Sequence, residues 1–103
     1  MELVQDALSR FPENPTLYIY AGDICHSLKL YDQAFNYWRW VKELDKGPLD
    51  AYYSMGFCYE ELEQYKEAYQ IWKELRRELL SRGLNQEQQL PVEHMRLCQE
   101  RMG

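Results

Sequence analysis

Apolar residues recur along the chain at steps of three and four, the spacing that places them on one face of an α-helix. Tyr52, Met55, Gly56 and Tyr59 form one such stripe. A second stripe, which contains Ala68, follows after a short polar turn. The pattern therefore predicts two consecutive helices that pack against each other through these stripes.

A shift of 34 residues aligns the chain with itself without gaps, which indicates an internal repeat. The aligned identical pairs are Tyr18 with Tyr52, Gly22 with Gly56, Leu28 with Leu62, Tyr31 with Tyr65, Ala34 with Ala68 and Trp38 with Trp72. The sequence thus predicts one helix pair within residues 15–48 and a second within residues 49–82.

The residues at the ends of these segments suit helix boundaries. Asn14 and Pro15 stand where an N-cap and the first helical residue are expected. The run 46–48, Lys-Gly-Pro, breaks a helix, and Asp50 suits the first turn of the next one. Gly83 is a plausible C-cap for the last helix of the second pair.

Small residues mark the places where two helix backbones are expected to approach closely. Gly22 and Gly56 lie on the first helix of each pair, and Ala34 and Ala68 lie on the second. A large aromatic residue stands one turn from each alanine, where it fills the space beside the crossing.

These features resemble the tetratricopeptide repeat. That family's pattern places an aromatic residue, Leu-Gly and Tyr on the first helix, Ala-x-x-x-Phe on the second, and a closing Pro. The second repeat here reads Tyr52-x-x-Met55-Gly56-x-x-Tyr59 and Ala68-x-x-x-Trp72, and the first reads Tyr18-x-x-Ala21-Gly22-x-x-Cys25 and Ala34-x-x-x-Trp38. Ala21 and Cys25 depart from the pattern, and both full repeats lack the closing Pro.

The resemblance implies an all-α fold, a right-handed superhelical stack of antiparallel helix pairs with about six helices. Residues 1–14 are then half a repeat, 15–48 and 49–82 are full repeats, and 83–103 form a loop followed by a capping helix over 91–102. We expect these parts to form a single domain. Because the first helix would lack its partner helix, we also expect the chain to be the C-terminal piece of a longer protein. The alternative is that a second copy of the chain covers the open face of this helix.

The composition narrows the classes of partner. The chain of 103 residues carries a net charge of −5, which disfavours a nucleic acid or an anionic membrane surface. Its three cysteines form no C-x-x-C pair, so reduced thiols in the cytoplasm are the simpler interpretation. No apolar run approaches the ~20 residues that span a bilayer.

The resemblance also implies that the first helices line a concave groove that binds a partner. The residues expected to line it are Ile19, Tyr20, Asp23, His26, Tyr53, Ser54, Phe57, Glu60 and Glu61. Their aromatic and acidic character suits an apolar peptide or helix that carries basic residues. The alternative is that the capping helix, or a preceding part of a longer protein, covers these side chains.

One known ligand of this family is the C-terminal carboxylate of heat-shock chaperones, which paired Lys and Asn residues hold. The matching positions here are Ile19, Asp23, Asp50 and Ser54, of which two are anionic and none is cationic. These positions would repel a carboxylate, so a chaperone tail is not the expected ligand.

Tyr37 and Trp40 indicate a second contact surface, because the second repeat has Glu74 at the place of Trp40. Two explanations stay open for this tryptophan. It packs on the loop before Pro48 or on the N-terminal half repeat, or it forms a convex surface for self-association or for the rest of a longer protein.

Candidate chemistry is sparse. His94 and Cys98 have the i, i+4 spacing of a ligand pair, and Cys25 and His26 are adjacent, but packing explains these residues more simply than a metal does. The sequence has no phosphate-binding loop and no nucleophile motif. We therefore expect a protein-interaction module without a cofactor, not an enzyme. The alternative is a structural spacer or self-association element, including a homodimer.

Overall fold

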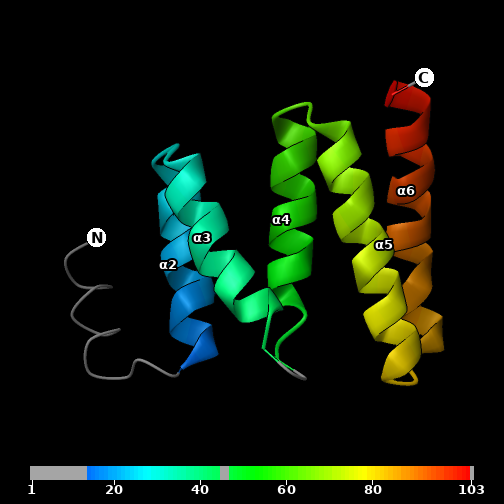
Figure 1. Ribbon diagram of the computed structural model, residues 1–103, viewed down its shortest axis with the longest axis horizontal. Coiled ribbons are helices and arrows are strands. Elements are labelled where there is room, and N and C mark those ends of the chain that lie inside the picture. The colour runs from blue at the N-terminus through cyan, green and yellow to red at the C-terminus, as the bar shows by residue number, and fades with distance from the viewer. Residues whose placement is uncertain (1–13, 45–46, 103) are drawn as a thin grey trace. The chain divides into compact units, whose positions relative to one another are not determined.

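The computed structural model describes residues 14–44 and 47–102, and this part of the chain is helical without a strand. Its α-helices are α2 (Pro15–Ser27), α3 (Tyr31–Lys42), α4 (Asp50–Glu61), α5 (Tyr65–Ser81) and α6 (Gln89–Met102), with a short 3₁₀ helix, η1 (Asn85–Gln88), before α6 (Figure 1). The predicted all-α class is confirmed. The helix predicted before Pro15 lies outside the described residues.

The chain divides into two compact units. Unit 1 comprises residues 1–54, with α2, α3 and the beginning of α4. Unit 2 comprises residues 55–103, with the rest of α4, α5, η1 and α6. None of the described helices combines the length and apolar character that crossing a membrane requires.

The start of α2 follows a local capping rule. The side chain of Asn14 accepts a hydrogen bond from the backbone N–H of Thr16 at 3.0 Å, and Pro15 is the first residue of α2. Both residues therefore have the predicted roles. The N–H of a proline is missing at a position where an N–H has no partner within the helix in any case.

The turn that joins the two helices has the same backbone in both repeats. Lys29 and Glu63 stand at matching positions with left-handed φ angles of 62° and 59°. After Lys29, the N–H of Leu30 donates to the carbonyl of Cys25 at 2.8 Å, and the matching bond of the second turn has the same length. This is the hydrogen-bond pattern that ends a helix at a left-handed residue. The sequence repeat is therefore also a repeat of backbone conformation.

The loop predicted over residues 83–90 is wrong in part. Gly83 does end α5 with a left-handed φ of 73°, but η1 and the first turn of α6 follow it. The helix begins at Gln89, two residues before Pro91, which is buried. A proline is tolerated there because the first four N–H groups of a helix have no carbonyl partner within it.

A tryptophan lies against a glycine at the centre of each helix pair. In unit 1, a Cβ added to Gly22 would overlap the indole of Trp38, and in unit 2 a Cβ on Gly56 would come within 2.5 Å of the indole of Trp72. The glycines thus make room for an aromatic ring, whereas the repeat pattern had indicated only a close approach of two backbones. Trp38 is 1% exposed and Trp72 is 0% exposed.

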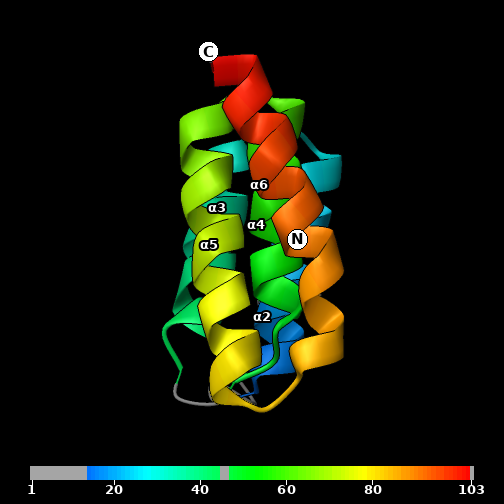
Figure 2. The same cartoon turned by 90° about the vertical axis from the view of Figure 1, so that its right-hand side faces the viewer.

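The rest of each core is formed by the predicted apolar stripes. In unit 1 the fully enclosed side chains of α2 and α3 include Ala21, Cys25, Ala34 and Val41. In unit 2, α6 packs alongside α5, as Figure 2 shows, and its Cys98 is buried. The capping helix is therefore part of the core of unit 2.

Candidate functional site

The residues predicted to bind a partner fall into both units. Unit 1 contains Ile19, Tyr20, Asp23, His26, Tyr53, Ser54 and the second pair Tyr37 and Trp40, whereas unit 2 contains Phe57, Glu60 and Glu61. Each group contains both exposed and half-buried side chains.

In unit 1, α2 presents three of these residues along one side. Tyr20, Asp23 and His26 follow one another at steps of three, so they are neighbours on the helix surface. Tyr20 is 61% exposed and Asp23 is also exposed, whereas His26 is half-buried. The neighbouring Ile19 is half-buried as well. An aromatic ring and a carboxylate thus lie side by side and open to solvent.

Asp23 has an unfavourable electrostatic environment. Desolvation raises its pKa above the ordinary 3.8, and the nearby carboxylate of Asp50 raises it further. Interactions with the indole of Trp38 and with His26 lower the pKa, but they do not outweigh the desolvation. An ionised carboxylate at this place therefore costs free energy in the folded protein.

The indole N–H of Trp38 lies next to this carboxylate. Its nitrogen is buried and has no acceptor in hydrogen-bonding geometry. The interaction that lowers the pKa of Asp23 comes from this group, so the two side chains are neighbours without a well-formed bond.

The other predicted residues of unit 1 are less open. The imidazole of His26 lies 6.0 Å from the rings of Tyr31 and Trp38, measured between centroids. Tyr53 and Ser54, at the beginning of α4, are half-buried. Tyr20 and Asp23 are therefore the two candidates of α2 that a partner can reach most directly.

In unit 2, Glu60 is held by three neighbours through one oxygen. Its Oε2 accepts from the indole N–H of Trp72 at 2.6 Å and lies 2.7 Å from Nδ1 of His94. The thiol of Cys98 is 4.0 Å away. The Glu60 side chain is only 14% exposed. Because His94 and Cys98 belong to α6, the capping helix occupies a place predicted for a ligand.

Phe57 is only partly covered by the same helix. Its ring meets Trp72 edge-on at 5.0 Å and His94 edge-on at 5.1 Å between centroids, and 45% of the residue remains exposed. Glu61 is exposed. In unit 2, therefore, the alternative prediction, cover by the capping helix, describes Glu60 well and Phe57 in part.

The buried cysteines of unit 2 have little reactivity. Desolvation, followed by the charge of Glu61, raises the pKa of Cys58 to about 11, and desolvation followed by Glu60 raises the pKa of Cys98 to about 11. A thiol that stays protonated at neutral pH is a poor nucleophile.

Both residues of the predicted second surface contact another aromatic ring of unit 1. Trp40 stacks on Tyr18 of α2, with 4.0 Å between ring centroids and 23° between the planes. Tyr37 lies 6.1 Å from the same tyrosine. Both Tyr37 and Trp40 are half-buried. The repeat pattern does not predict Tyr18 as the partner, because it places Tyr18 on the stripe that packs beside Trp38.

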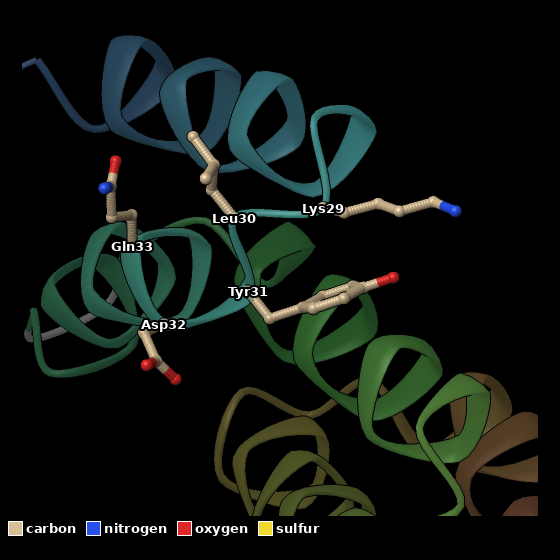
Figure 3. A pocket seen from close by; sticks show the side chains of 5 residues that line it. All are labelled: Lys29, Leu30, Tyr31, Asp32 and Gln33. Atoms are coloured by element: carbon tan, nitrogen blue, oxygen red, sulfur yellow. The ribbon is translucent and has the colours of Figure 1, made fainter.

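A shallow pocket of about 330 Å³ lies at the turn between α2 and α3, lined by Lys29, Leu30, Tyr31, Asp32 and Gln33 (Figure 3). Lys29 and Tyr31 point away from Leu30 and Gln33, and Asp32 points to a third side. A ligand site needs polar groups that converge on one volume, and these side chains diverge.

Comparison with known proteins finds no family model that matches this sequence, and no match among curated proteins. The candidate site is accordingly defined by its own geometry. That geometry consists of an open surface on α2 and a covered surface at Glu60.

Proposed function

We propose that the chain is a protein-interaction module of the tetratricopeptide type that binds a peptide or helix and performs no chemistry of its own. The observation that carries the proposal is Tyr20, a large aromatic side chain that is 61% exposed on the first helix of a helix pair. Exposed aromatic residues beside polar ones are typical of the anchor points of protein interfaces.

The surroundings of Tyr20 specify the partner. Asp23 lies one turn further along α2, and the whole chain has a net charge of −5. An apolar side chain on Tyr20 together with a basic group at Asp23 would satisfy both features. The partner we propose is therefore apolar with basic residues, and a carboxylate tail, a nucleic acid and an anionic membrane do not fit.

The binding surface that we propose is smaller than the groove predicted from the sequence. Glu60 has its hydrogen-bonding partners within unit 2, through Trp72 and His94, so it needs no ligand. We place the contact on α2, with Tyr20 as the anchor. Cys25, Cys58 and Cys98, which all lie in the described residues, form no disulfide, and we propose a reducing compartment, the cytoplasm.

Selection from a displayed library of helical peptides tests the function. We expect the full chain to enrich sequences with an apolar residue and a Lys or Arg one turn apart. Tyr20→Ala should weaken their binding about tenfold or more, as expected for an interface anchor. Leu80→Ala, which truncates an exposed apolar residue of α5, is the matched control and should leave binding unchanged. Enrichment that ignores Tyr20 would contradict the proposal.

A second candidate function is self-association through α6. Leu90 and Leu97 are exposed and lie two turns apart on the same side of this helix. A structural element that pairs two copies would bury them. Sedimentation equilibrium distinguishes the candidates, because a dimer that Leu97→Glu dissociates would favour self-association, and a monomer would exclude it.

A further inference from the structure

The two tryptophans at the centres of the helix pairs provide an internal comparison. In unit 2, the indole N–H of Trp72 donates to Glu60, and the same oxygen is held by His94 from a third helix. A carboxylate thus lies between two donors, the buried indole and a side chain that can carry positive charge. The arrangement satisfies every member.

Unit 1 also contains a buried indole with a carboxylate beside it. The indole N–H of Trp38 is buried without an acceptor in hydrogen-bonding geometry, and the carboxylate of Asp23 is its neighbour. The indole nitrogen of Trp38 lies against Gly22, the residue before Asp23. The groups that influence the pKa of Asp23 are this indole, the imidazole of His26 and the carboxylate of Asp50. Among the described residues, no Lys or Arg contributes to the electrostatic environment of this carboxylate.

We propose that Asp23 and Asp50 bind the ammonium or guanidinium group of a Lys or Arg side chain from the partner, and that Trp38 then completes its hydrogen bond to Asp23. The inference rests on the proposed function and names the polar half of that binding surface. The partner's cation would supply the second hydrogen-bond donor to Asp23, as His94 contacts Glu60 in unit 2.

The charges explain why a cation is the missing member. Asp23 and Asp50 repel each other, and Asp23 has lost part of its hydration. A cation between them removes the repulsion and keeps Asp23 ionised, so its oxygens can accept from both the cation and the buried indole. A neutral donor would leave the repulsion in place, and an anion would increase it. The guanidinium group suits the site best because it offers several donors in one plane.

The indole N–H resonance of Trp38 reports this event directly. We would titrate the isotope-labelled full chain with N-acetyl-arginine amide and, in parallel, with N-acetyl-citrulline amide, its uncharged isostere. We expect a saturable downfield shift of Trp38 with the arginine probe only. Trp72, which already has its acceptor, should not move and serves as the internal control.

Variants assign the cation to its carboxylates. Asp23→Asn and Asp50→Asn should each weaken binding of the arginine probe about fivefold, the upper range for an exposed charge pair. Asp32→Asn, which neutralises an exposed carboxylate of α3, is the matched control and should leave binding unchanged. We expect the melting temperature of Asp23→Asn to be no lower than that of the parent. Such a melt would show that the variant is folded.

Three results would overturn the proposal: equal shifts with the arginine and citrulline probes, no shift of Trp38, or full binding by Asp23→Asn. The probe has no apolar anchor, so this test does not depend on Tyr20. A chain that binds the arginine probe but selects no Tyr20-dependent peptide retains the cation site and loses the proposed function. A chain that selects Tyr20-dependent peptides but does not bind the arginine probe retains the proposed function and loses the cation site.

Discussion

Trp38 in unit 1 and Trp72 in unit 2 occupy matching positions of the repeat and lie against matching glycines, but their indole N–H groups differ. Trp72 donates to Glu60, which α6 also contacts, whereas Trp38 has no acceptor in hydrogen-bonding geometry. The same apolar packing thus comes with a satisfied polar group in one unit and an unsatisfied one in the other. Because native proteins rarely leave a buried donor unpaired, the difference favours unit 1 as the binding unit.

The contact between a glycine and an indole ring, which both units share, should be the most costly feature to change. Gly22→Ala and Gly56→Ala should each destabilise the protein by about 1–3 kcal/mol or more, because the added Cβ overlaps an enclosed indole ring. Denaturant unfolding measures the loss. Ser27→Ala, an exposed change on α2, should be near neutral. If either glycine variant were as stable as the parent, the indole would not lie against that glycine.

Removing the carboxylate of Glu60, the hydrogen-bond acceptor in unit 2, should have the next largest effect on the free energy of unfolding. Glu60→Ala removes the carboxylate that accepts from the buried N–H of Trp72, and we expect the free energy of unfolding to fall by about 1–3 kcal/mol together with faster amide exchange in α6. Glu60→Gln keeps an acceptor oxygen and should lose less. Equal losses for the two variants would mean that side-chain volume, not the hydrogen bond, determines the stability.

The left-handed residues of the two turns provide a test of symmetry between the repeats. Lys29→Gly and Glu63→Gly should each raise the free energy of unfolding by up to about 1 kcal/mol, because glycine adopts a positive φ without steric cost. Thermal melts of both variants measure the gain. Since the two φ angles match, a gain in one turn only would show that the turns differ in solution.

Asp23→Asn should have the smallest effect. At neutral pH we expect it to raise the free energy of unfolding by a few tenths of a kcal/mol, which is about the size of an exposed charge interaction. Burial raises the pKa of Asp23 above 3.8, so the folded state holds the proton more tightly than the unfolded state. Ionised Asp23 therefore opposes folding at neutral pH. The difference in the free energy of unfolding between variant and parent should shrink as the pH falls through the pKa of Asp23 in the folded state towards 3.8. Melts across this pH range measure the difference.

Loss of stability in Asp23→Asn at neutral pH would show that ionised Asp23 stabilises unit 1. At saturating concentration, the arginine probe should reverse the order of stability of the two proteins, because it binds the parent more tightly and therefore stabilises the parent more than the variant. A residue of a binding site is expected to lower the stability of the free protein and to raise the stability of the protein with its ligand bound.

The all-α class and several helix ends could be predicted from local signals. Asn14 and Pro15 fix the start of α2, and Gly83 fixes the end of α5, because each rule acts within a few residues. The predicted start of α6 at Pro91 is wrong by two residues, because a proline fits anywhere in the first turn of a helix and does not mark its first residue.

The polar contacts could not be predicted in the same way. Nothing in the repeat pattern distinguishes Glu60, which binds Trp72 and His94, from its counterpart His26. The contact depends on where α6 lies, and α6 departs from the repeat. Trp40 shows the same limit, since its stacking partner Tyr18 is on another helix, at a position that the repeat pattern assigns to the core.

The indole region of a proton–nitrogen correlation spectrum tests the central claim most directly. The chain has three tryptophans, so Trp→Phe variants assign every signal. Without any ligand, we expect Glu60→Ala to move the Trp72 signal strongly upfield and Asp23→Ala to move the Trp38 signal much less, because only Trp72 has a carboxylate acceptor. Equal upfield shifts of the two signals would mean that both indoles are already satisfied. That result would contradict the difference between the units from which the binding site is inferred.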